Sequence, residues 1–195
     1  GAGNDLIVNC GIHSKARGLW SDAQRATAAH STLVINDTNS SEIREDGSLG
    51  RRPQHVESRR EEADNTTFLE ASHDGYREPF GAMHRRCIYL SADGYDVRGE
   101  DSVIGAQPCR FSIRFHLHPA VRSSLLAGGK DAILRLPSGE GWRLQTSGAS
   151  LHLHESIYFG SEDDGRRTEQ LVLQGQSTDG GAVVKWALKR IGPVS

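Results

Sequence analysis

The sequence has no long apolar run, and neither sign of charge dominates it. None of its apolar stretches approaches the roughly 18 residues that a membrane-spanning helix needs, so we expect no membrane span. Its 23 Lys and Arg residues nearly balance 25 Asp and Glu residues, and the formal net charge is −2 at pH 7. A domain that binds nucleic acid through its overall charge is strongly basic. We therefore expect no nucleic-acid partner.

Cysteine is scarce, and common catalytic motifs are absent. Cys10, Cys87 and Cys109 cannot all pair with one another, and their spacing fits neither a zinc knuckle nor a Cys-x-x-Cys redox motif. Strand-like sequence flanks each of them, which favours buried free thiols and leaves the compartment open. The sequence also lacks the Gly-x-Ser-x-Gly elbow of serine hydrolases and a glycine loop that cradles phosphate.

What the sequence does contain is an alternation of apolar and polar residues with a period of two. The clearest example runs from Cys109 to His118, where odd positions are apolar and even positions are Arg, Ser or His. Such alternation predicts a strand with one face on a core and a polar opposite face. Pro119 should end this strand, because proline has no N–H for the sheet ladder.

Similar strand signals recur along the chain, separated by glycine-rich turns. The other predicted strands are residues 6–10, 30–36, 67–73, 84–90, 131–136, 142–146, 150–155, 168–174 and 182–189. Many short strands of this kind predict an all-β fold, an antiparallel β-sandwich of layered sheets, and residues 1–195 suit a single domain.

Three stretches depart from the strand pattern. Residues 22–29 and 119–127 each have room for a turn or two of helix. Residues 37–64 are polar and rich in Arg and Glu, which predicts a long excursion with a short strand around Val56.

Nine histidines are more than structural roles usually need. His116 and His118 share one face of their strand, and His152 and His154 share one face of theirs, because side chains two apart point the same way. If the two strands were neighbours, four imidazoles would converge on zinc or copper, as in a cupin-like metal-binding sandwich. A polar outer face, or a face packed against another domain, explains both pairs without metal.

Two further histidines lie in distinctive surroundings. Small residues flank His30 and leave room for a ligand or a metal, although a lone histidine is more often structural. The tetrad from His73 to Tyr76 has the residue types of a catalytic group. A turn in which Asp74 and Gly75 supply the positive φ explains it more economically.

Arginine occurs in adjacent pairs. The guanidinium fork matches the carboxylates or sulfates of an acidic glycan, whereas charge runs on protein surfaces usually serve solubility. Both interpretations stay open for the pairs Arg51-Arg52, Arg59-Arg60, Arg85-Arg86 and Arg166-Arg167.

Taken in order, the motifs resemble the C-terminal domain of bacterial heparinase II/III-like proteins. The resemblance spans almost the whole chain. The matching stretches are residues 6–11, 25–33, 37–40, 71–76, 99–101, 114–119, 141–142, 155–160 and 170–173.

This resemblance implies a parent protein that combines an N-terminal helical toroid with layered β-sheets and cleaves uronic-acid polysaccharides by β-elimination. The start at Gly1, with Met83 as the single methionine, likewise favours a piece of a longer protein. The acidic polysaccharide and the helical domain are then the expected partners, and the periplasm or cell envelope is the expected compartment.

β-Elimination needs a group that neutralises the uronate carboxylate, a base that removes the C5 proton and an acid that protonates the leaving oxygen. In the family these groups come mostly from the toroid, with one histidine in a His-x-His element upstream. We therefore expect no catalytic residue in this chain and no cleavage by it alone. The resemblance implies one wall of the substrate cleft, with Arg25 and His30 as substrate-binding residues.

The resemblance also implies a metal position. Related lyases hold zinc with the second histidine of the upstream element, an Asp before a Gly, and a later His. The later His matches His30, but the Asp matches Asn9, whose neutral amide oxygen is a poorer zinc ligand. Zinc is thus expected at most in the full-length protein. One more alternative is a non-catalytic carbohydrate-binding module, which requires an exposed aromatic platform.

Overall fold

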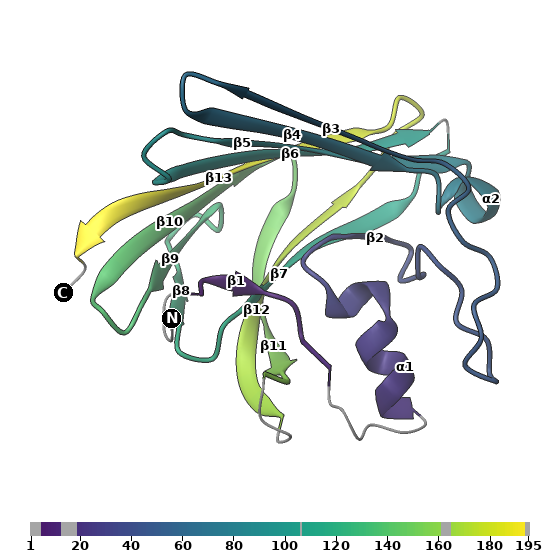
Figure 1. Ribbon diagram of the computed structural model, residues 1–195, viewed down its shortest axis with the longest axis horizontal. Helices are drawn as coiled ribbons and strands as arrows, with labels where there is room; N and C mark the ends of the chain where they lie inside the picture. The colour runs from purple at the N-terminus through teal and green to yellow at the C-terminus, as the bar shows by residue number, and fades with distance from the viewer. Residues whose placement is uncertain (1–4, 13–18, 106, 161–164, 194–195) are drawn as a thin grey trace.

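The fold is built from two antiparallel sheets, which confirms the expected all-β sandwich (Figure 1). The computed structural model describes residues 5–12, 19–105, 107–160 and 165–193. No helix within these ranges is long and apolar enough to cross a membrane.

The smaller sheet has the strand order β1-β7-β12-β11, and β2 also pairs with β7. Its strands are β1 (Ile7–Val8), β2 (Leu33–Ile35), β7 (Arg110–Leu117), β11 (Ser150–Tyr158) and β12 (Arg166–Gln176). The larger sheet has the order β3-β4-β5-β6-β13-β10-β9-β8. Its strands are β3 (Val56–Ala63), β4 (Thr66–His73), β5 (Ala82–Leu90), β6 (Asp96–Gly105), β8 (Arg122–Leu125), β9 (Asp131–Arg135), β10 (Glu140–Ser147) and β13 (Ala182–Pro193).

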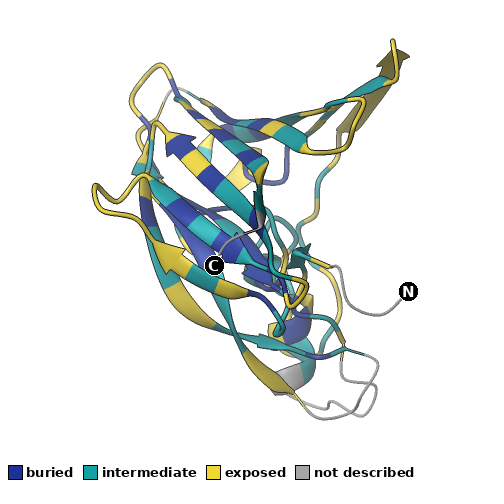
Figure 2. Cartoon of the chain, turned by 90° about the vertical axis from the view of Figure 1, so that its left-hand side faces the viewer, coloured by how far each residue is buried: buried dark blue, intermediate teal, exposed yellow. Residues whose placement is uncertain are grey.

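The core lies between the two sheets, where inward-facing apolar side chains from both meet. Phe115 of β7 packs edge-on against Trp186 of β13, with ring centroids 4.9 Å apart. Ile113, Leu144 and Leu171 are fully buried around them, and each such side chain stabilises the fold by about 1.5–3 kcal/mol on burial. Figure 2 shows buried residues gathered in the central strands, whereas turns and outlying strands are mostly exposed.

Short helices lie at the margin of the sandwich. They are α1 (Leu19–Arg25), the 3₁₀ turn η1 (Thr27–Ala29) and α2 (Arg77–Phe80). The helical turns expected within residues 22–29 are therefore present, and Figure 1 shows α1 on the side of the smaller sheet, near β2.

The strand expected at residues 109–118 is present as β7, but its second face is not the polar surface that alternation predicts. Ser112 and His116 on that face are buried. His116 donates from Nε2 to the carbonyl oxygen of Ala28 at 2.9 Å, so the η1 segment covers this part of the strand.

Two parts of the larger sheet, β8 and β3, differ from the prediction. Residues 119–127 contain strand β8 rather than a helical turn. The short strand expected around Val56 is the eight-residue strand β3, whose residues are all exposed. It joins β4 through Asp64 and Asn65, which both have positive φ as a tight hairpin turn requires.

Strand β6 was not expected from the sequence, because Gly99 and four charged residues interrupt any apolar pattern. Gly99 faces Trp186 across the β6–β13 pair. A Cβ at Gly99 would lie 2.0 Å from Cζ2 of Trp186, so only glycine leaves room for this indole.

Candidate functional site

The structure brings two of the predicted site residues, Arg25 and His30, into one pocket. Its volume is about 250 Å³, and it lies between the α1–η1 segment and the loop that follows β2. Hydroxyl side chains predominate in the rest of its lining, which consists of Thr27, Thr32, Ser40, Ser41, Ile43 and Leu49. We call this the Arg25–His30 pocket.

Local hydrogen bonds fix the two walls of the pocket against each other. The backbone N–H of Thr27 donates to Oδ1 of Asn39 at 2.8 Å, and the N–H of Ser40 donates to Oγ1 of Thr27 at 2.9 Å. His30 closes η1 by donating its backbone N–H to the carbonyl oxygen of Thr27. The loop and the helical segment therefore form one hydroxyl-lined concavity around an exposed imidazole.

Arg25 is exposed, and its Nη1 donates to the carbonyl oxygen of Gly47 at 2.7 Å. This bond holds the guanidinium over the loop, and the planar fork carries further N–H donors for a bidentate anion. Residues 37–50, which the sequence indicated only as part of a long excursion, form the second wall of the pocket. Their polar composition is the sequence signal that could have indicated this role.

Asn9, the third predicted residue, does not line this pocket. Its Oδ1 accepts the backbone N–H of Ser31 at 2.8 Å, so it supports the residue next to His30. Among the described residues, no group of three or more His, Cys, Asp or Glu side chains is placed to hold a metal ion. His30 and the neutral, already bonded Asn9 oxygen do not suffice for zinc.

The two His-x-His pairs form no metal-binding group among the described residues. In register, His154 pairs with Gln170, which pairs on its other side with His116. Both ring nitrogens of His116 are occupied by Ser156 of β11 and by the carbonyl oxygen of Ala28, which argues against the cupin-like alternative. His152 and His154 instead lie beside each other, with ring centroids 6.0 Å apart.

His116 is a buried support behind the pocket. Because a carbonyl only accepts, its Nε2 carries the hydrogen donated to Ala28, and Nδ1 accepts from the Ser156 hydroxyl at 2.7 Å. Burial lowers the pKa of His116, which favours this neutral tautomer. Cys10 lies against the ring, with Sγ 3.4 Å from Nδ1, and burial raises the pKa of its thiol.

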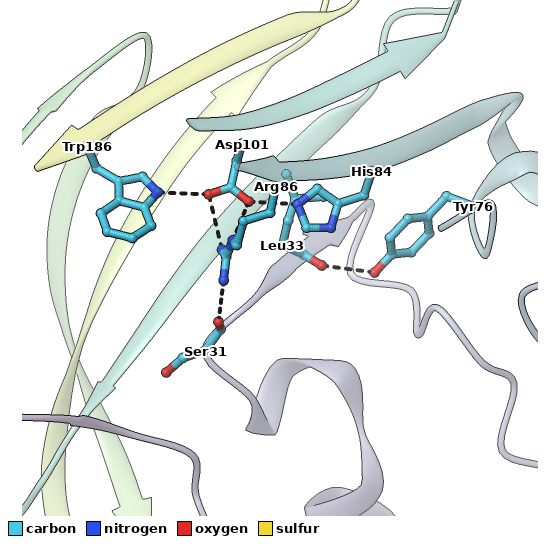
Figure 3. A network of polar contacts seen from close by, with 7 residues as sticks. All are labelled: Ser31, Leu33, Tyr76, His84, Arg86, Asp101 and Trp186. Atoms are coloured by element: carbon cyan, nitrogen blue, oxygen red, sulfur yellow. Dashed lines mark hydrogen bonds and ion pairs between the residues drawn. The ribbon is translucent and has the colours of Figure 1, made fainter. Parts of the chain in front are cut away.

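A second polar network lies between the sheets and is centred on Asp101 (Figure 3). The fully buried carboxylate accepts from Nε2 of His84 at 2.6 Å, from Nε of Arg86 at 2.7 Å and from Nε1 of Trp186 at 2.9 Å. Burial alone would raise the pKa of Asp101, but His84 and Arg86 hold it below its usual value. The carboxylate therefore stays charged inside the sandwich.

This network reaches the His30 segment through Arg86. Nη1 of Arg86 donates to the carbonyl oxygen of Ser31 at 2.7 Å. The hydroxyl of Ser31 donates to the carbonyl oxygen of Val8 at 2.6 Å and accepts the backbone N–H of His116. Sequence patterns did not reveal this arrangement, because its members come from strands far apart in the chain.

The tetrad from His73 to Tyr76 is structural. The Tyr76 hydroxyl is buried and donates to the carbonyl oxygen of Leu33 at 3.1 Å, and burial raises the pKa of Tyr76 to about 12. Burial lowers the pKa of His73 to about 4, with a further contribution from nearby His84. The expected positive φ at Gly75 is wrong: this glycine is needed because a Cβ would lie 2.6 Å from the Ser40 carbonyl oxygen.

Several of the paired arginines have protein partners. Arg51 donates to the carbonyl oxygens of Asn39, Ser40 and Gly75 and so holds loops together. Arg59 and Arg60 pair with Glu61 and Glu62 on β3. For these three residues, a structural or surface role accounts for the side chain.

The cysteines are free thiols, as expected. Cys10 and Cys109 are buried, whereas Cys87 is only partly covered on the outer face of the larger sheet.

The fold and the sequence together define the class of protein to which this chain belongs. A family model described as heparinase II/III-like, C-terminal, matches residues 2–187, and the chain belongs to this family.

Particular relatives are known for both sequence and structure. The chain is 31% identical over 215 residues to FtsZ-localized protein C of Caulobacter vibrioides (strain NA1000 / CB15N), covering 95% of this chain and 35% of that protein. Heparan sulfate lyase HepC from Pedobacter heparinus superposes with a TM-score of 0.78 at 13% identity, over 97% of this chain and 29% of the lyase. A heparinase III structure gives 0.76 at 12% identity, over 97% and 28%.

The chain thus spans about a third of the length of these proteins. At 12–13% identity, the likeness to the two lyase structures shows the shared fold alone.

Proposed function

We propose that this domain contributes the Arg25–His30 pocket to the acidic-glycan cleft of a heparinase II/III-like polysaccharide lyase. The observation that carries the proposal is the convergence of Arg25 and His30 with four hydroxyl side chains in one pocket of about 250 Å³. A guanidinium fork beside an imidazole suits a uronate carboxylate or a sulfate. The surrounding hydroxyls suit the hydroxyl groups of a sugar ring.

In this role the chain binds and orients substrate and does not transfer protons. Arg25 would hold the anionic group, and His30 would lie against the ring that carries it. We assign no catalytic residue here, and we propose that the base, the acid and the carboxylate-neutralising group belong to the helical domain of the same protein. Cleavage then requires that helical domain.

Binding is tested by calorimetry with a heparan sulfate tetrasaccharide and the 195-residue chain. Arg25→Gln should weaken binding about tenfold, the effect of losing one charge-assisted hydrogen-bonded contact. The matched control is Arg52→Gln, which alters an exposed arginine outside the pocket. Equal affinity of Arg25→Gln and the unaltered chain would sink the proposal.

Cleavage is tested by the ultraviolet absorbance of unsaturated uronate. The 195-residue chain should produce none from heparan sulfate, whereas the protein that includes the helical toroid should produce it. Absorbance that rises with the chain alone would contradict the assignment of chemistry to the helical domain. Periplasmic or cell-envelope location belongs to the same proposal, and fractionation of the parent cells tests it.

Zinc in the full-length protein is a separate proposal, which depends on a ligand beyond His30 and Asn9. Because an Asn oxygen is a weak zinc ligand, Asn9→Asp should increase the zinc content of the full-length protein, measured by elemental analysis. His30→Gln in the same background should reverse the increase. Unchanged zinc in both variants would argue against a site at these residues.

A second function is favoured by one specific observation. The identity to FtsZ-localized protein C is 31%, against 12–13% to the lyase structures. The alternative is a non-cleaving domain in a protein that localises with FtsZ. A fluorescent fusion of the full-length protein that follows FtsZ, together with no product from any acidic glycan, would favour this alternative.

A further inference from the structure

The outer face of the larger sheet carries an open groove that the proposed function does not use. Its volume is about 500 Å³, and it crosses β4, β5, β6, β13 and β10. Figure 1 shows this face on the far side of the sheet from α1 and the smaller sheet. The groove is therefore a separate surface from the Arg25–His30 pocket.

Aromatic side chains form the floor of this groove on one side. Phe68 of β4 and Tyr89 of β5 are directly paired across the two strands, and both line the groove. Directly paired residues have Cβ atoms about 5 Å apart, so the two side chains lie side by side on this face. The guanidinium of Arg59 lies over the Phe68 ring, 5.8 Å from its centre, so Tyr89 offers the more open ring. Tyr89 is 38% exposed. An exposed tyrosine offers an apolar ring face and a polar hydroxyl, and the C–H face of a sugar ring can stack on such a ring.

Charged side chains form the other side, and cations outnumber carboxylates there. Asp96 is shared by Arg98 at 2.8 Å and Lys189 at 3.3 Å. Strand alternation places all three residues on the face that contains the groove. Each carboxylate that serves two cations leaves one positive charge uncompensated.

The neighbouring row repeats this arrangement. Glu100 is shared by Lys185 and Arg85, each at 3.8 Å. On the opposite flank, Arg59 faces Glu61 and Glu70, so that flank carries a net negative charge. The groove is thus positive over β6 and β13, aromatic in the middle and negative toward β3.

From this layout we infer that the groove is a second saccharide-binding site, which takes an acidic oligosaccharide. One sugar ring stacks on Tyr89 beside Phe68, and a carboxylate or sulfate on the adjoining ring faces Arg98 and Lys185. The charge distribution on this face fixes the direction of the bound oligosaccharide, because Glu61 and Glu70 repel its anionic ring. Carbohydrate lyases and binding modules both gain from such a site, since a second contact holds a long polymer near the first.

The test uses the 195-residue chain with a hyaluronan tetrasaccharide, which carries carboxylates, and with maltotetraose as a neutral control. Tyr89→Ala should weaken hyaluronan binding about tenfold, and Lys185→Gln about threefold. The matched control is Tyr95→Ala, which removes an exposed tyrosine outside the groove. Near-ultraviolet circular dichroism establishes that each variant is folded.

Cys87 supplies an independent readout because it lines the groove, whereas Cys10 and Cys109 are buried. Bound tetrasaccharide should slow alkylation of Cys87 by iodoacetamide, measured by mass spectrometry, in the unaltered chain and in Arg25→Gln. Protection that is lost in Arg25→Gln and kept in Tyr89→Ala would assign binding to the Arg25–His30 pocket and overturn this inference. That outcome would leave the proposed function standing.

Three other outcomes also overturn it. They are equal affinity for maltotetraose, equal weakening by Tyr95→Ala, and self-association of the chain that Tyr89→Ala abolishes. The last result would identify the groove as an interface between two copies of the chain.

Discussion

Two clusters in this domain contain the same side-chain types but serve different purposes, one structural and one suited to binding. The Asp101 network combines an arginine and a histidine with a buried carboxylate between the sheets. The Arg25–His30 pocket combines an arginine and a histidine at the surface, and its lining contains no carboxylate. Burial and the presence of a protein anion therefore separate the structural cluster from the one suited to an external anion.

The sharpest way to break this comparison is to remove the buried carboxylate. Asp101→Ala leaves Arg86 charged and the Trp186 N–H without an acceptor, so we expect a loss of about 3–5 kcal/mol in the free energy of unfolding. Urea denaturation measures this loss. Glu62→Ala, which breaks an exposed ion pair with Arg60, should cost no more than about 1 kcal/mol. Similar costs for the two variants would show that burial does not distinguish them.

A smaller loss is expected where packing, not charge, maintains the network. Gly99→Ala forces a Cβ against the Trp186 indole that donates to Asp101. Overpacking of this kind costs about 1–3 kcal/mol. Thermal unfolding should reveal the loss, and Gly180→Ala is the control for the glycine itself, because Gly180 lies in an open turn without a positive φ. A Gly99→Ala chain as stable as the unaltered chain would place the indole elsewhere.

The pH dependence of stability should follow the buried histidines. The pKa of His73 is about 4 in the folded chain, below its ordinary 6.5, so the unfolded state binds more protons between these values. Stability should therefore be fully present above pH 6.5 and fall as the pH decreases toward 4. His73→Gln should flatten this part of the profile in urea titrations, whereas replacement of the exposed His154 should not. A slope that His73→Gln leaves unchanged would assign the effect to other groups.

The smallest effect on stability is expected at the pocket. Arg25 is exposed and bonds to a loop carbonyl, so Arg25→Gln should change the free energy of unfolding by no more than about 0.5 kcal/mol. Its effect should instead appear in glycan affinity. A large loss of stability would show that Arg25 has a structural role, and it would contradict the distinction between the Asp101 network and the Arg25–His30 pocket.

The sequence allowed the fold class and most strands to be predicted, because period-two alternation follows directly from the geometry of a strand. Strand β6 was not predicted, because its partners lie elsewhere in the chain. Gly99 is explained by Trp186, 87 positions further along, and the acidic residues are explained by cations on β5, β6 and β13. Strand β3 was underestimated because it is exposed on both faces and shows no apolar alternation.

The candidate site was partly predictable. Arg25 and His30 stood out through the family resemblance and the small residues around His30. Their hydroxyl-bearing neighbours Ser40 and Ser41 did not, since only tertiary contacts bring that loop to η1. Burial of His116 was equally hidden, because the segment that covers it comes from another part of the chain.

Ser31, the residue beside His30, is held from several directions. Its N–H, hydroxyl and carbonyl groups all have protein partners, in Asn9, Val8, His116 and Arg86. The backbone next to the imidazole is thus already ordered before any ligand arrives, and association need not spend free energy on immobilising it. A glycan that fits this surface would dissociate slowly for its contact area. The backbone here would adjust little to a glycan that does not fit.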